Sequence, residues 1–202
     1  MLYKFLSGLA KGVTHCIFRV KVVGKENVPK DGGMILAVNH KSNWDPIFAG
    51  AYCPRPLRFM AKADLFKNKL FGGLIKKLGA FPIQRGRGDI GAIKGAFSIL
   101  KNNDAMLIFP EGHRIKNGKR VKAKLGVSMI AVYAKVPVIP LCISGEYKPF
   151  HKVTVTFGKP ITFEEYYGKK PDNETLQTLA DEVMQTIYSF DNTDIKKIGD
   201  QK

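Results

Sequence analysis

His40 and Asp45, five positions apart, are the residues whose types and spacing best fit chemistry. His40 follows an apolar run at residues 34–38, which predicts a buried strand, and Asp45 with Pro46 is typical of a helix start. A tight turn between them would fold the carboxylate onto the imidazole. A carboxylate bonded to one ring nitrogen fixes the tautomer and leaves the other nitrogen as a base. The alternative is structural: a hydrogen-bonded histidine at a strand end beside an ordinary helix cap.

Three further segments follow or form short apolar strands. Residues 79–85 end in a cation, Arg85, and residues 109–114 have the sequence Phe-Pro-Glu-Gly-His-Arg, which presents an acid and a cation. Residues 136–141 form a stiff, proline-containing apolar segment. Ligands of α/β folds usually lie at the ends of strands, so we expect these side chains near the His40 turn.

The four segments, in this order, resemble the glycerolipid acyltransferase family typified by lysophosphatidic acid acyltransferase. The first block of that family is N-H-x4-D, the second ends in arginine, the third is F-P-E-G-T-R, and the fourth is a proline-rich apolar strand. The resemblance extends from about residue 22 to residue 157, and the loop at residues 26–32 matches as well. One such block is weakly specific, whereas four in order at family-like spacing are a strong indication.

The resemblance implies an enzyme that moves an acyl chain from a thioester to an alcohol. The donor would be acyl-CoA or acyl carrier protein, the acceptor the sn-2 hydroxyl of 1-acyl-sn-glycerol 3-phosphate, and the product phosphatidic acid. His40 would take the hydroxyl proton with Asp45 orienting it, an effect typically worth about 10²–10⁴-fold. Backbone N–H groups near the His40 turn are candidate oxyanion donors. No cofactor and no metal are expected.

The same resemblance places cations around the glycerol phosphate. Arginine offers phosphate a forked donor, and lysine offers a point charge. Glu111 would orient either Arg114 or the acceptor hydroxyl, and the alternative is a local surface ion pair between Glu111 and Arg114. His113 stands where the family has Thr or Ser, a departure that bears on acceptor choice. The substrate-binding residues expected are Lys62, Arg85, Glu111, Gly112 and Arg114.

The elements that must position these residues alternate between strands and helices. Strands are predicted at about residues 18–23, 34–38, 57–61, 80–84, 105–109, 138–144 and 153–157. Helices are predicted at about residues 1–17, 46–52, 70–78, 89–100, 124–135 and 172–188. The alternation predicts an α/β fold: a single domain with a mixed, largely parallel central sheet flanked by helices, plus an N-terminal amphipathic helix. We expect residues 18–190 to form the acyltransferase domain and residues 191–202 to form a polar tail.

The N-terminal helix, residues 1–17, has an apolar stripe with basic residues on another side. Such a helix can lie in a membrane interface with its cations facing anionic lipid, or it can cover the core of its own domain. No run of about eighteen uncharged apolar residues occurs, so we expect no spanning helix. We expect peripheral or monotopic association with the cytoplasmic face of the cell membrane. The stripe consists of Leu2, Phe5, Leu6, Leu9, Val13, Cys16 and Ile17.

The composition limits the other function classes. Apolar residues make up 45% of the 202 residues, enough for a full core, and the net charge of +16 favours an anionic partner. No recognition helix, zinc pair or aromatic RNA-binding signature supports nucleic acid, and no G-x-S-x-G elbow supports a serine hydrolase. The three cysteines lack metal or redox spacing. The alternatives left open are an acyltransferase for another lysolipid or for glycerol 3-phosphate, and a basic non-enzymatic protein that binds membrane or nucleic acid.

Overall fold

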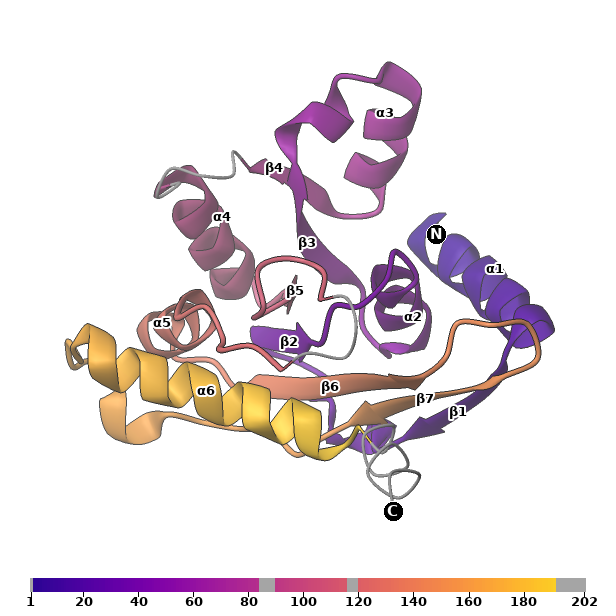
Figure 1. Cartoon of the computed structure of the whole chain (residues 1–202). Helices are drawn as coiled ribbons and strands as arrows, with labels where there is room; N and C mark the ends of the chain where they lie inside the picture. Colours follow the sequence, from indigo (N-terminus) through magenta and orange to yellow (C-terminus); the bar gives the residue numbers. More distant parts are fainter. Residues whose placement is uncertain (1, 84–89, 116–119, 192–202) are drawn as a thin grey trace, which may run out of the picture.

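A computed structural model of the chain describes residues 2–83, 90–115 and 120–191. Seven strands form one sheet in the order β1-β7-β6-β2-β5-β3-β4 (Figure 1). The strands are β1 (Arg19–Val23), β2 (Met34–Val38), β3 (Leu57–Lys62), β4 (Ala80–Ile83), β5 (Ala105–Ile108), β6 (Val138–Gly145) and β7 (Lys152–Phe157). The helices are α1 (Leu2–Ile17), α2 (Asp45–Tyr52), α3 (Lys69–Lys77), α4 (Ile90–Lys101), α5 (Gly126–Ala134) and α6 (Asn173–Ser189).

Strand β2 lies near the middle of the sheet, between β6 and β5. Ile35 is opposite Val138 of β6 on one side and Met106 of β5 on the other. Every neighbouring pair is parallel except β6 with β7, so β1 and β7 run against the other five strands. The predicted mixed, largely parallel sheet is confirmed. All five residues of β2 are buried, which is why the strand has a continuous apolar sequence.

Helices cover both faces of the sheet (Figure 1). Successive side chains of a strand point to opposite faces, so β2 contributes to two cores. Ile35 and Ala37 pack with α4, α5 and α6, whereas Leu36 and Val38 pack with α2 on the other face. Helix α1 lies against α2 and β1 on this second side. Because helices cover both faces of the sheet, the loops meet at the ends of the central strands.

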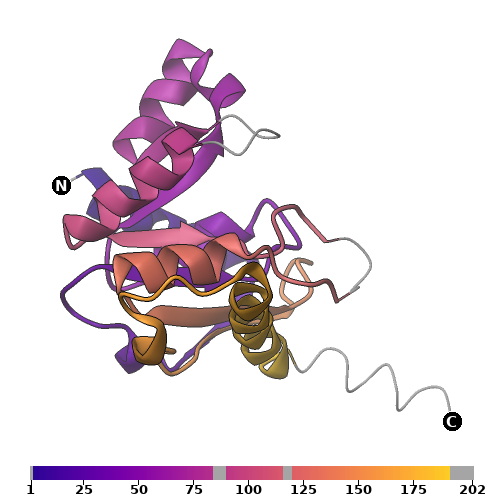
Figure 2. The same ribbon diagram turned by 90° about the vertical axis from the view of Figure 1, so that its left-hand side faces the viewer.

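The segment between β3 and β4 projects from the body of the molecule. Figure 2 shows α3 standing beyond the edge of the sheet, with the 3₁₀ turn η2 (Ala63–Phe66) leading into it. Gly79 follows the C-cap of α3 with φ of +94°, and a Cβ there would lie 2.7 Å from the carbonyl oxygen of Leu57. Glycine is therefore required for the turn into β4.

The predicted elements are present in the described residues, with ends that differ by one or two positions. Asp89, the first residue of the helix predicted at residues 89–100, and residues 192–202 of the predicted tail lie outside those residues. No helix in the part of the chain that the structure describes is both long and apolar enough to cross a bilayer.

Candidate active site

Asn39 fixes the start of the turn that carries His40. Its buried amide pairs with both backbone groups of Ile143 on β6: Nδ2 donates to the carbonyl at 3.1 Å, and Oδ1 accepts the N–H at 2.8 Å. The turn is therefore held to the neighbouring strand just where β2 ends. This role of Asn39 was not apparent from the sequence, because its partner lies 104 residues away.

Asp45 folds back onto the turn, as its spacing from His40 suggested. Its fully buried Oδ2 accepts from His40 Nδ1 at 2.9 Å and from the backbone N–H groups of Lys41 and Ser42, each at 2.6 Å. The predicted N-cap role of Asp45 is wrong. Trp44 is the N-cap residue, and Asp45 lies inside the helix with its carboxylate bonded to the preceding turn instead. The imidazole is thereby oriented through Nδ1, which leaves Nε2 as the nitrogen that can act as a base.

Tyr147, just beyond β6, completes the surroundings of Asp45. Its hydroxyl donates to Asp45 Oδ1, and its ring packs against Phe18 and Phe48. Burial raises the pKa of the Tyr147 hydroxyl, and the negative charge of Asp45 raises it further. The phenol is therefore a neutral donor at physiological pH. Sequence reasoning missed Tyr147, which is 102 residues from its partner.

Glu111 holds the backbone of His40. It follows β5, the neighbour of β2, and its Oε2 accepts the N–H of His40 at 2.7 Å. Its Oε1 accepts from the hydroxyl of Tyr188 on α6 at 3.1 Å. Burial raises the pKa of Glu111 to about 7 against the opposing effect of these two hydrogen bonds, and the charge of Asp45 also raises it. The contacts described for Glu111 fix His40 and do not include Arg114. A role in orienting the acceptor hydroxyl stays a prediction.

The loop after β5 packs directly on the candidate base. The ring of Phe109 stacks on the imidazole of His40 with ring centroids 4.0 Å apart, and Ile115 N–H donates to the carbonyl of His40 at 2.7 Å. Gly112 has φ of +74°, and its N–H donates to the carbonyl of Phe109 at 3.0 Å. A side chain at Gly112 would be strained in that backbone conformation. We assign Gly112 to the turn that carries Glu111.

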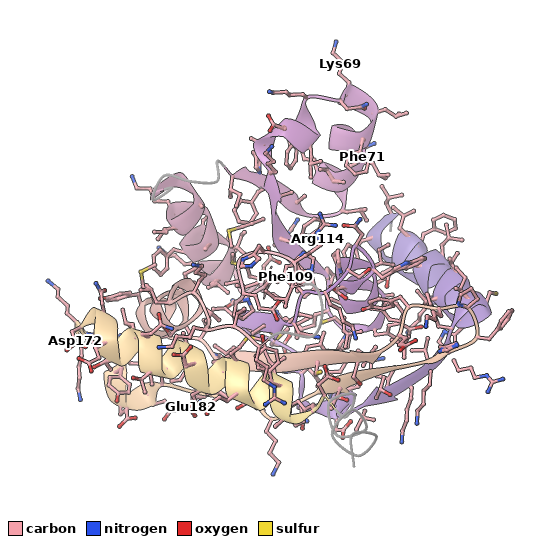
Figure 3. The ribbon with its side chains drawn as sticks, viewed as in Figure 1. Lys69, Phe71, Phe109, Arg114, Asp172 and Glu182 are labelled. Atoms are coloured by element: carbon pink, nitrogen blue, oxygen red, sulfur yellow. The ribbon has the colours of Figure 1, made fainter. Side chains whose placement is uncertain are left out.

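The predicted cations lie at different distances from the turn that carries His40. Arg114 is exposed and donates from Nη1 to Oδ1 of Asn43 in the His40 turn at 2.7 Å. Figure 3 shows Arg114 and Phe109 near the centre of the molecule, between α3 and α6. Lys62 ends β3, two strands from β2 or roughly 10 Å across the sheet, and it pairs with Asp64 at 2.5 Å. Arg85 lies outside the described residues.

Three backbone amides of the His40 turn already have partners. The N–H groups of His40, Lys41 and Ser42 all donate to buried carboxylates. Those three amides stabilise the turn and are not available to a substrate in this conformation. The identity of the oxyanion donors among the other backbone N–H groups near the turn stays a prediction.

An apolar cavity of about 390 Å³ lies beside the turn, on the face of the sheet that α2 covers. Residues of α1, α2, β3 and α3 line the cavity. Pro46, which directly follows Asp45, is among them, and so is Leu107 of β5. The cavity is thus next to the candidate base and suited to a hydrocarbon chain.

Comparisons with known proteins identify the family of this chain. The family model described as Acyltransferase matches residues 19–144. A 1-acyl-sn-glycerol-3-phosphate acyltransferase of Bacillus subtilis (strain 168) is 31% identical over 95% of this chain and 98% of its own. The enzyme of that name from Streptococcus pneumoniae (strain ATCC BAA-255 / R6) is 32% identical, covering 100% of this chain and 78% of its own.

The fold is similar to that of a solved enzyme as well. The crystal structure of the 1-acyl-sn-glycerophosphate (LPA) acyltransferase PlsC from Thermotoga maritima superimposes with a TM-score of 0.75 at 28% identity, over 93% of this chain and 78% of that chain. The resemblance first indicated by four short sequence blocks is confirmed, and the chain belongs to the acyltransferase family.

Proposed function

We propose that this acyltransferase acylates the sn-2 hydroxyl of 1-acyl-sn-glycerol 3-phosphate and so forms phosphatidic acid. The observation that carries the proposal is the imidazole of His40, bonded through Nδ1 to the buried carboxylate of Asp45 at 2.9 Å. The names of the relatives in Bacillus, Streptococcus and Thermotoga support this acceptor.

In the proposed reaction, His40 Nε2 takes the proton of the acceptor hydroxyl as its oxygen attacks the thioester carbonyl. The tetrahedral intermediate then expels the thiolate, and the imidazolium returns the proton to sulfur. Asp45 stabilises the imidazolium between these steps. The thioester already carries a good leaving group, so we expect the transfer to need no cofactor.

Arg114 and Lys62 are the described cations that we assign to the acceptor phosphate. Arg114 is the stronger candidate because its guanidinium is tied to Asn43 within the turn of the base. Lys62 is exposed and its ammonium shares Asp64 with Lys67, so it would have to exchange that partner for phosphate. We place one acyl chain in the apolar cavity beside Pro46.

Helix α1 supports peripheral attachment at the cytoplasmic face of the cell membrane. Its only buried side chain is polar: the hydroxyl of Thr14 contacts that of Tyr52 at 2.8 Å, while Ser7 Oγ donates to the carbonyl of Gly50 at 3.1 Å. Four of its large apolar side chains are exposed instead, with Phe5 at 69%, while Ala10 and Ile17 pack against the core. A helix with polar groups inward and an apolar outer stripe beside lysines is suited to an anionic lipid surface. The exposed members of the stripe are Leu2, Phe5, Leu9 and Val13.

The test is thiol release from two donors, acyl-CoA and acyl carrier protein. Each donor is offered with 1-acyl-sn-glycerol 3-phosphate, with lysolipids of other head groups and with glycerol 3-phosphate. We expect turnover with at least one donor, and the largest kcat/KM with 1-acyl-sn-glycerol 3-phosphate. A preference for glycerol 3-phosphate or for another lysolipid would contradict the proposed acceptor.

His40→Ala tests the base, and His151→Ala is its matched control. His151 is an exposed histidine beside β7 whose ring lies 3.8 Å from Glu146. We expect His40→Ala to lose at least about 100-fold in kcat, and His151→Ala to keep the parental rate. Folded His40→Ala protein, verified by circular dichroism, with near-parental thiol release would show that the base is another group.

A further inference from the structure

Large apolar side chains that face solvent gather on one side of the molecule. Of the twelve in the described residues, nine belong to α1, α2, η2 and α3. Four of the nine lie on η2 and α3. Leu65 and Phe71 also line the apolar cavity, whereas Leu70 and Leu74 lie outside it and the proposed active site does not use them. We call these four the α3 apolar patch: Leu65, Leu70, Phe71 and Leu74.

Helix α3 is well formed without any partner on this patch. Asn68 caps it, accepting from the N–H groups of Leu70 at 3.1 Å and Phe71 at 2.9 Å. Its inner side packs through Gly72, where a Cβ would come within 2.7 Å of Phe66, and through buried Ile75. The outer side carries Leu70, which is 88% exposed. The exposure is therefore a property of a packed and capped helix.

Basic residues surround the patch. Residues 62–77 contain five lysines and one aspartate, a net charge of +4. Asp64 pairs with Lys62 and Lys67, while Lys69, Lys76 and Lys77 are exposed on α3 itself. Figure 3 shows Lys69 extending from the far end of the projection. An apolar centre with lysines around it is the pattern of an interfacial helix that binds anionic lipid.

The α3 apolar patch and the outer stripe of α1 flank one cavity. Leu6 and Ala10 of α1 line it together with Phe71 and Ile75 of α3. The N-terminal end of α1 lies close to α3 in both orientations of the molecule (Figures 1 and 2). A surface that accepts α1 would therefore also meet α3, and the cavity opens between the two helices.

We infer that η2 and α3 form a second membrane-docking element, which inserts the α3 apolar patch into an anionic bilayer beside α1. This inference rests on the proposed function in one respect, that the substrate is a lipid. The cavity then opens into the lipid layer, and its acyl chain enters without crossing water. A soluble acidic protein such as an acyl carrier would also be attracted by the lysines. The exposed apolar side chains, and the cavity that Leu65 and Phe71 share with α1, favour the bilayer.

The experiment uses an environment-sensitive fluorophore on single cysteines. Cys16 is exposed and is replaced by serine, whereas Cys53 and Cys142 are buried and stay. The label is attached in separate full-length proteins at Leu70→Cys, at Leu9→Cys on α1, and at Tyr133→Cys on α5. Tyr133 is the matched control, because it is an exposed large side chain on a helix of the opposite layer. The probes are vesicles of phosphatidylglycerol with phosphatidylcholine, vesicles of phosphatidylcholine alone and, in a separate titration, soluble acyl carrier protein.

We expect blue-shifted emission at positions 70 and 9 on anionic vesicles and no shift at position 133. A response at position 9 without one at position 70 would overturn the second element while leaving α1 docking intact. A response at position 70 to soluble acyl carrier protein, with none to vesicles, would also overturn it and assign the patch to a protein partner. No response at either position would overturn docking by both helices.

A binding measurement complements the label. Leu70→Asp should weaken cosedimentation with anionic vesicles at least about tenfold, since it removes a leucine that would insert into the bilayer and adds a charge that anionic lipid repels. Tyr133→Asp should leave binding unchanged. Leu70→Asp should also retain parental turnover of a short-chain, water-soluble acceptor, which separates failed docking from a failed active site. Parental vesicle binding by folded Leu70→Asp protein would overturn the inference.

Discussion

Replacing Tyr147 by phenylalanine isolates one hydrogen bond to the carboxylate that orients the base. The aromatic ring stays, so its packing against Phe18 and Phe48 is preserved and only the hydroxyl is lost. Asp45 is fully buried, and Tyr147 is the side chain that donates to its Oδ1. The His40 imidazole and two backbone amides all donate to the other oxygen, Oδ2.

The magnitude follows from the burial and charge of Asp45. A hydrogen bond to a charged group contributes about 1.5–3 kcal/mol to the net free energy of unfolding. For a chain of about 200 residues each kcal/mol corresponds to about 2–4 °C in Tm, so Tyr147→Phe should lower Tm by roughly 3–12 °C. Without the Tyr147 donor to Oδ1, the carboxylate of Asp45 also orients the imidazole of His40 less well. We therefore expect kcat to fall while both substrate KM values stay near those of the parent.

The assay is a double-mutant cycle at these two positions. Unfolding free energies are measured for the parent, Tyr147→Phe, Asp45→Asn and the double variant. Because the two groups are in contact, we expect the cost of Tyr147→Phe to shrink by about 1 kcal/mol or more when Asp45 is already neutral. Tyr133→Phe, which alters an exposed hydroxyl on α5, is the control and should be neutral. Additive effects, or a Tyr147→Phe protein with parental Tm and kcat, would refute the assigned role of the hydroxyl.

Further outcomes are expected at the other site residues. The pKa of Glu111 is raised from its ordinary value of 4.5 to about 7, so between these pH values the folded state keeps a proton that the unfolded state has lost. The unfolding free energy should therefore fall by up to about 3 kcal/mol as pH rises through that window. Glu111→Gln should abolish this fall in denaturant titrations. Arg114→Ala and Lys62→Ala should raise the acceptor KM more than the donor KM, and an equal loss with an acceptor lacking phosphate would contradict the phosphate role. Asn39→Ala leaves both backbone groups of Ile143 unpaired and should lower the unfolding free energy by at least about 2 kcal/mol, measured by urea unfolding.

The parts of the site that the sequence predicted well are those set by local pattern. Buried parallel strands have continuous apolar sequences, so β2 and β5 could be recognised together with the polar residues at their ends. The contact of His40 with Asp45 follows from a short turn between a strand and a helix, and it needed no knowledge of strand order. The apolar stripe of α1 could be predicted equally well from the sequence, because it depends on helical periodicity alone.

The parts that the sequence did not predict depend on partners far along the chain. Tyr147 and Tyr188 lie 102 and 77 residues from the carboxylates that they contact, and neither belongs to a recognisable motif. The contact of Glu111 with the N–H of His40 was missed for the same reason, since it requires β5 to lie beside β2. Local pattern also could not tell that α1 would bury Thr14 and expose Phe5, since periodicity does not determine which face of a helix is covered.

The carboxylates of Asp45 and Glu111 both bond to His40, but to different groups of that residue. Asp45 holds the imidazole and receives four donors, whereas Glu111 holds the backbone N–H and receives two. Burial of Glu111 outweighs its two hydrogen bonds and raises its pKa to about 7. Each carboxylate is in turn fixed by a tyrosine, Tyr147 after β6 or Tyr188 on α6. Both tyrosines belong to the C-terminal half of the chain, so that half supplies contacts that fix the two carboxylates beside His40, the proposed base.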